Sequence, residues 1–74
     1  MRGEAVTVEC YSGQTYAERP VRLLWEGTYL DVDDVAAEWR EPGSRHFRVR
    51  ARDDRTFDLC YDERYDGWTA VELR

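Results

Sequence analysis

The chain has 74 residues, which is enough for one small domain and leaves no room for a second hydrophobic core. Charged residues make up 36% of it, and no apolar run approaches the roughly 20 residues of a membrane-spanning helix. The net charge of −5 repels phosphate backbones and anionic lipid, and it favours a neutral or basic partner. We therefore expect a single domain over residues 1–74 that lies in the cytoplasm, has a protein partner and does not bind membranes.

Two segments near the N-terminus show the alternation of apolar and polar residues that is typical of a β-strand with one buried face. The apolar positions are Val6, Val8 and Cys10 in the first segment, and Val21, Leu23 and Trp25 in the second. The polar stretch 12–19 predicts a loop between them. Gly27 predicts a tight turn into a third strand.

Residues 31–40 fit either of two structures. They could form a short helix with Asp31 as its N-cap. As a strand, they need a bulge near Asp33 and Asp34 to restore the alternation that begins at Leu30. The strand is favoured because a clear hairpin partner follows it. The face that it would bury holds Val35, Ala37 and Trp39.

Pro42 and Gly43 predict the hairpin turn after this strand. A two-residue loop would mix apolar and charged residues on both faces, because it sets Trp39 beside His46 and Glu38 beside Phe47. A three-residue loop over 42–44 separates the two kinds of side chain, and we therefore predict it. The expected pairs are Trp39 with Phe47, Ala37 with Val49, Val35 with Ala51, Glu38 with Arg48, and Asp34 with Arg52.

The next hairpin has a predicted three-residue loop over 52–54. The expected pairs are Val49 with Phe57, Phe47 with Leu59, and Arg48 with Asp58. A connection over 62–67 leads to a last strand over 68–73. Five or six short strands with tight turns predict an all-β fold, either a small bent antiparallel sheet or an open SH3-like barrel.

The order of aromatic and aliphatic residues between Val8 and Leu73 resembles a known family. The matching segments are Pro20-Val21-x-Leu23-x-Trp25-x-Gly27-x-Tyr29, Trp39-Arg40-Glu41, Phe47-Arg48-Val49, Phe57-x-Leu59 and Gly67-Trp68. They resemble an uncharacterised bacterial family of short domains of unknown function, which stand alone or form the C-terminal tail of some Y-family translesion DNA polymerases. The resemblance implies an accessory role in DNA-damage tolerance and supplies no catalytic residues.

The chain offers little for catalysis or for metal binding. His46 is the only histidine, and although Cys60 is expected opposite it, no third group or oxyanion device is visible. We expect Cys10 and Cys60 to be reduced, half-buried strand residues. The acidic run 31–34 lacks the glycine and the closing glutamate of a calcium loop. The sequence therefore predicts no enzyme activity, no metal and no cofactor.

The candidate interaction surface combines one row of arginines with several tyrosines. Arg48, Arg50 and Arg52, which we call the arginine row, share one face of the predicted strand. They could bind phosphates, but the expected register places Glu38, Asp58 and Asp34 opposite them and favours a charge ladder. The tyrosines expected to be exposed are Tyr11, Tyr16, Tyr29 and Tyr65.

Two functions are consistent with these features. The first is a non-catalytic protein-interaction or accessory module that uses an exposed strand edge or an aromatic groove. The alternative is a small barrel that binds single-stranded nucleic acid through the arginine row, although the acidic charge disfavours it. A homodimer through an unpaired strand edge is a further expectation.

Overall fold

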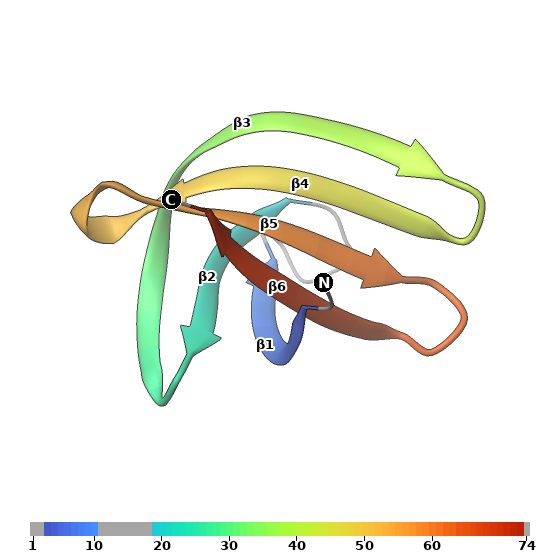
Figure 1. The fold of residues 1–74 in the computed structure, drawn as a ribbon, viewed down its shortest axis with the longest axis horizontal. Coiled ribbons are helices and arrows are strands. Elements are labelled where there is room, and N and C mark those ends of the chain that lie inside the picture. The colour runs from blue at the N-terminus through green and yellow to red at the C-terminus, as the bar shows by residue number, and fades with distance from the viewer. Residues whose placement is uncertain (1–2, 11–18, 74) are drawn as a thin grey trace.

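A computed structural model describes residues 3–10 and 19–73 of the chain. This part of the chain forms six strands and one short 3₁₀ turn over Arg52–Asp54 (Figure 1). The strands are β1 (Glu4–Cys10), β2 (Pro20–Trp25), β3 (Thr28–Glu41), β4 (Ser44–Ala51), β5 (Arg55–Asp62) and β6 (Gly67–Leu73). The segment 31–40 is therefore strand, as predicted.

The six strands form a closed antiparallel barrel in which each strand pairs with its neighbour in sequence. β1 closes the barrel because it pairs with β2 over Thr7–Cys10 and with β6 over Glu4–Val6. The prediction of a small all-β barrel is confirmed, and the barrel is closed rather than open. Closure pairs the first strand with the last, which would both lie at free edges in an open sheet.

The barrel interior holds the apolar residues that the alternation predicted for β4 and β5. Phe47 and Phe57 are fully buried, and the indole of Trp25 packs edge-on against Phe57 with the ring centroids 5.0 Å apart. The buried core consists of Leu23, Trp25, Leu30, Phe47, Val49, Ala51, Phe57, Leu59, Tyr61 and Ala70.

The β4–β5 hairpin confirms its predicted register in every pair. Val49 pairs with Phe57, and Arg48 pairs with Asp58, across a loop formed by the 3₁₀ turn. Asp53 and Asp54 in this turn have φ values of 64° and 62°, a left-handed conformation that aspartate tolerates better than most residues.

The β3–β4 hairpin differs from its predicted register. Its loop has two residues, Pro42 and Gly43, because Glu41 pairs with Ser44. The predicted loop of three residues over 42–44 is wrong, and all pairs of this hairpin shift accordingly.

Two bulges in β3 explain why the shorter loop is compatible with an apolar interior. The predicted bulge lies between Val32 and Asp34, and a second one, at Ala36, lies between Val35 and the next paired residue. Each bulge inverts the faces of the residues beyond it. The bulges therefore bring Val35 opposite Val49 and Val32 opposite Ala51, so that apolar residues still meet.

The second bulge also turns the end of β3 outward. Trp39 pairs with His46 and is 39% exposed, so its predicted place in the core is wrong. Ala37 is likewise exposed, although it was predicted to be buried.

A third irregularity changes the start of β2. The β1–β2 register shifts between Glu9 and Cys10, so that Arg22 pairs with Glu9 and Pro20 pairs with Cys10. Val21 has no paired residue in β1 and is 38% exposed, although the alternation predicted that it would be buried. Pro20 is fully buried instead. Proline suits the first position of a strand because it has no N–H to donate.

We predict that Phe57→Ala lowers the free energy of unfolding by about 3–5 kcal/mol, because it leaves a cavity beneath Trp25. A domain of this size has roughly 4–10 kcal/mol of stability, so the variant should be close to unfolding. Urea denaturation followed by tryptophan fluorescence measures this. The control is Tyr65→Ala, at a residue that is 77% exposed, where we expect a change within about 0.5 kcal/mol. Equal losses in both variants would contradict the assignment of the core.

Candidate interaction surfaces

Every guanidinium of the arginine row has a carboxylate within 4 Å. Arg48 makes two hydrogen bonds to Asp58, from Nε to Oδ1 at 2.7 Å and from Nη2 to Oδ2 at 2.9 Å. Arg50 lies 3.7 Å from Asp34. Arg52, in the 3₁₀ turn, lies 3.9 Å from Asp31. The row is therefore one side of a ladder of alternating charges that runs across β3, β4 and β5.

The ladder was predicted, but two of its partners were not. Asp58 faces Arg48 as expected, whereas Asp34 pairs with Arg50 and not with Arg52. Glu38 lies 3.3 Å from Arg45, on the other face from Arg48. These differences follow from the two-residue loop and the second bulge, which shift β3 along β4.

Pairing lowers the capacity of the row to bind phosphate. The two hydrogen bonds to Asp58, together with its negative charge, raise the pKa of Arg48. A phosphate would have to displace this carboxylate from the Nε–Nη2 edge of the guanidinium, or bind the remaining Nη donors next to its negative charge. The geometry favours an ionic face that neutralises itself over a polyanion site.

The structure describes two of the four predicted tyrosines, and these two lie at different turns of the barrel. Tyr29 is 50% exposed near the β2–β3 turn, where the guanidinium of Arg22 lies 4.8 Å from its ring centre. Tyr65 is 77% exposed in the turn between β5 and β6, at the opposite side of the barrel (Figure 1). Tyr11 and Tyr16 lie outside the described residues.

On the β3–β4 hairpin, the exposed ring of Trp39 stacks on the half-buried ring of His46. The rings of Trp39 and His46 are parallel within 5°, with centroids 5.3 Å apart, and the guanidinium of Arg48 lies 6.0 Å from the Trp39 ring. Sequence reasoning missed this surface because it assigned Trp39 to the core. The signal that could have found it is the strength of Pro42-Gly43 as a two-residue turn.

His46 and Cys60 are paired across β4 and β5, as the sequence predicted. The Cys60 Sγ lies 4.0 Å from His46 Nε2, and the same nitrogen lies 3.2 Å from Glu41 and 3.1 Å from Ser44. A nucleophile–base–acid relay uses both ring nitrogens, one for each partner. Here the thiol and the carboxylate share one nitrogen, so the geometry is unsuited to such a relay.

The environment of Cys60 also disfavours its thiolate. Burial raises the pKa of the Cys60 thiol, and the negative charges of Asp62 and Glu41 raise it further. A reactive cysteine needs the opposite shift, because the thiolate is the nucleophile. Cys10 and Cys60 are both half-buried strand residues, as predicted, and no disulfide joins them.

Metal ligands do not cluster in this part of the chain. Among residues 3–10 and 19–73, no three His, Cys, Asp or Glu side chains are placed to hold an ion. None of the described segments forms a helix of the length and apolarity that crossing a bilayer needs.

One long strand edge stays open within the described structure. β3 pairs with β2 only over Thr28–Asp31, whereas from Val32 to Glu41 it has β4 on one side and no described strand on the other. In Figure 1 this half of β3 forms the outer border of the molecule. After the second bulge its pairing with β4 is regular from Ala37 to Glu41, and these residues are exposed.

Comparisons with known proteins do not assign the chain to a family. No family model, no curated protein and no solved structure matches the chain.

We predict that the Cys60 thiol titrates above the pH range of a free cysteine. In a Cys10→Ser variant, the rate of alkylation by iodoacetamide should rise only at higher pH than it does for the same chain unfolded in urea. Because the pKa is raised on folding, the unfolding free energy should fall as pH rises through the folded value. If the alkylation rates of the folded and unfolded chains rose at the same pH, this would contradict the effect of burial and of Asp62 and Glu41 on the Cys60 thiol.

We predict that the paired arginine row does not bind single-stranded DNA, and that removing its acids creates binding. Anisotropy of labelled oligo(dT) at low salt should stay flat with the wild-type chain and rise with Asp34→Asn/Asp58→Asn, with a steep salt dependence. Asp53→Asn/Asp54→Asn is the matched control, because it changes net charge equally and the ion pairs of the row use Asp58, Asp34 and Asp31 instead. Salt-sensitive binding by the wild-type chain would show that the ladder does not block the row.

Proposed function

We propose that the chain is a non-catalytic protein-interaction module whose partner adds an extended segment to the open edge of β3. The observation that carries this proposal is the regular, exposed stretch Ala37–Glu41, which no described strand covers. An edge of this kind offers backbone N–H and C=O groups to an incoming strand.

The side chains of β3 favour a particular kind of segment. Asp33, Asp34, Glu38 and Glu41 make this strand acidic, which suits a basic partner and repels other acidic chains. The bulges and charges are devices that prevent indiscriminate edge pairing. Trp39 supplies a large exposed aromatic surface in the middle of the regular stretch, and tryptophan often dominates binding energy.

The resemblance to polymerase tails supports a place for this module in DNA-damage tolerance. We propose a cytoplasmic accessory that contacts a Y-family polymerase of the same cell. Binding of single-stranded nucleic acid is the weaker alternative, because each arginine of the row already faces a carboxylate.

The test measures binding of the purified chain to the Y-family polymerase from the same genome by biolayer interferometry. We expect Trp39→Ala to weaken binding about tenfold or more, and Tyr29→Ala, at an exposed aromatic residue near the β2–β3 turn at the other end of β3, to leave it unchanged.

Absence of binding would contradict the polymerase link. Binding that Trp39→Ala leaves intact would contradict the β3 edge. A dimer of the chain in light scattering that Trp39→Ala dissolves would instead assign the edge to a second copy.

A further inference from the structure

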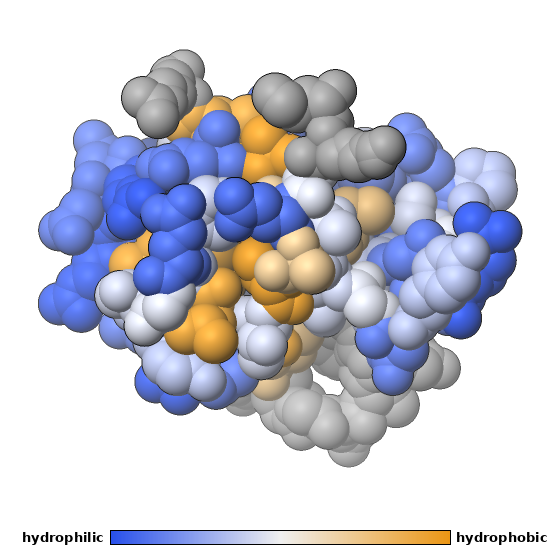
Figure 2. Space-filling model, turned by 60° about the horizontal axis from the view of Figure 1, so that its bottom comes forward, coloured by the Kyte–Doolittle hydropathy of each residue, from blue (hydrophilic) through white to orange (hydrophobic). Residues whose placement is uncertain are grey.

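A shallow hollow of about 400 Å³ opens on the side of the barrel formed by β1 and the β2–β3 turn. This volume is within the range of about 300–1,000 Å³ for small-ligand sites. Figure 2 brings this side forward and shows apolar surface open to solvent among hydrophilic side chains. The hollow lies on β1 and β2, whereas the open edge described above belongs to the second half of β3.

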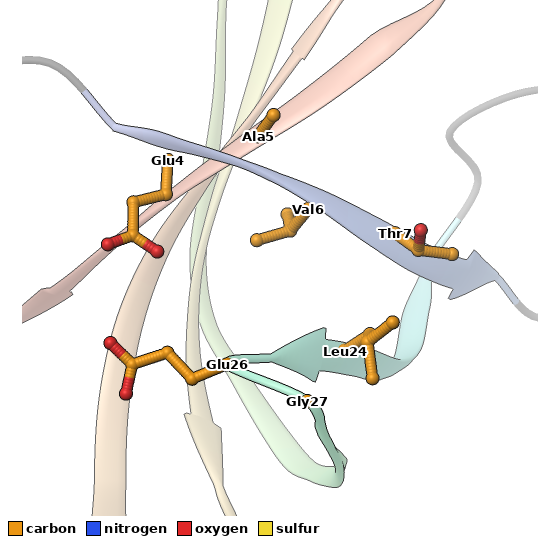
Figure 3. Close-up of a pocket in the computed structure, with 7 residues that line it drawn as sticks. All are labelled: Glu4, Ala5, Val6, Thr7, Leu24, Glu26 and Gly27. Carbon is orange, nitrogen blue, oxygen red and sulfur yellow. The ribbon is translucent and has the colours of Figure 1, made fainter.

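The hollow exists because β1 changes partner. Thr7 pairs with Leu24 of β2, but Glu4, Ala5 and Val6 pair with β6 instead. The two backbones therefore diverge beyond the Thr7–Leu24 pair. Val6 and Leu24, both half-buried, supply the apolar walls of the resulting gap (Figure 3).

Two glutamates stand at one end of this gap. Glu4 is on the diverging end of β1, and Glu26 is in the two-residue turn between β2 and β3, where its φ of 48° and the φ of 83° at Gly27 fix the backbone. Figure 3 shows their carboxylates directed toward one another. Two like charges that face each other repel, and a cation between them would relieve that repulsion.

These two acids differ from most acids of the outer surface. Neither Glu4 nor Glu26 has a hydrogen bond or an ion pair with a described residue. Glu9, on the same strand as Glu4, is by contrast 2.8 Å from Arg22. Hydrogen bonding to Glu72 raises the pKa of Arg55, and the charge of Glu26 helps to raise it. The guanidinium of Arg55 is already ion-paired with Glu72 at 2.9 Å, so the end of the hollow keeps a net negative charge.

We propose that this hollow binds a lysine or arginine side chain of a partner protein. Long basic side chains combine an apolar stem with a charged end. The stem would lie between Val6 and Leu24, and the cation would lie between Glu4 and Glu26. This site is separate from the β3 edge, and it gives the acidic chain a second contact that selects a basic partner.

The test uses the peptide acetyl-Leu-Arg-Leu-amide and ¹H–¹⁵N spectra of the full chain. We expect saturable shifts confined to the amides of residues 4–7 and 24–27. The same peptide with citrulline in place of arginine, which keeps the shape and removes the charge, should bind about fivefold more weakly. Added salt should reduce the difference between the two peptides.

Two double variants then test whether Glu4 and Glu26 supply the charge that favours the arginine peptide over the citrulline peptide. Glu4→Gln/Glu26→Gln should weaken binding of the arginine peptide about fivefold and abolish the preference over citrulline. The control is Asp53→Asn/Asp54→Asn, which removes two exposed acids of the 3₁₀ turn and changes net charge equally. It should leave the affinity for the arginine peptide and the preference over citrulline unchanged. If the first variant does not fold, the comparison of arginine with citrulline on the wild-type chain still decides.

Several outcomes would overturn the proposal while leaving the β3 edge untouched. They are equal affinity for the two peptides, shifts that lie elsewhere on the barrel, and displacement of the peptide by Ca²⁺ at equimolar concentration, which would indicate a metal site. Shifts at residues 4–7 that appear on raising the protein concentration alone would assign the hollow to a second copy of the chain.

Discussion

The structure depends on the alternation of side chains between the inside and the outside of a closed barrel. A small barrel has no second layer to bury a misplaced aromatic residue, so each strand must keep its apolar side chains on the inner face. β4 and β5 meet this condition without interruption, from Phe47 to Ala51 and from Phe57 to Tyr61. β3 meets it only with two bulges, which keep Val32 and Val35 against the core and leave Trp39 outside.

This difference explains how much could be predicted from the sequence. The β4–β5 hairpin was predicted pair by pair because its turn and its alternation agree. The β3–β4 hairpin was not predicted correctly, because no glycine or proline marks the second bulge at Ala36. Without that bulge, only a three-residue loop would keep the apolar side chains of β3 and β4 on the same face. The charge ladder survived this error, since Asp31 and Asp34 are spaced so that a shifted register still brings an acid to each arginine.

The hollow beside β1 was beyond sequence reasoning for another reason. It is made by two segments about 20 residues apart that separate because β1 changes partner between Val6 and Thr7. Alternation describes each strand by itself and carries no information about where neighbouring strands diverge. The same applies to the charges: Arg22 and Arg55 are matched by Glu9 and Glu72, and only the three-dimensional arrangement shows that Glu4 and Glu26 are not matched in this way.

The pairing of β1 with β6 has a consequence for folding. Strands β2 to β6 form a meander of local contacts, whereas the pair Glu4–Ala70 joins residues from nearly opposite ends of the chain. Such a contact closes the longest loop in the barrel, and its loop-closure entropy is therefore the largest. A molecule that bridges β1 and the β2–β3 turn would bind the folded barrel and not the unfolded chain, so its binding would stabilise the fold.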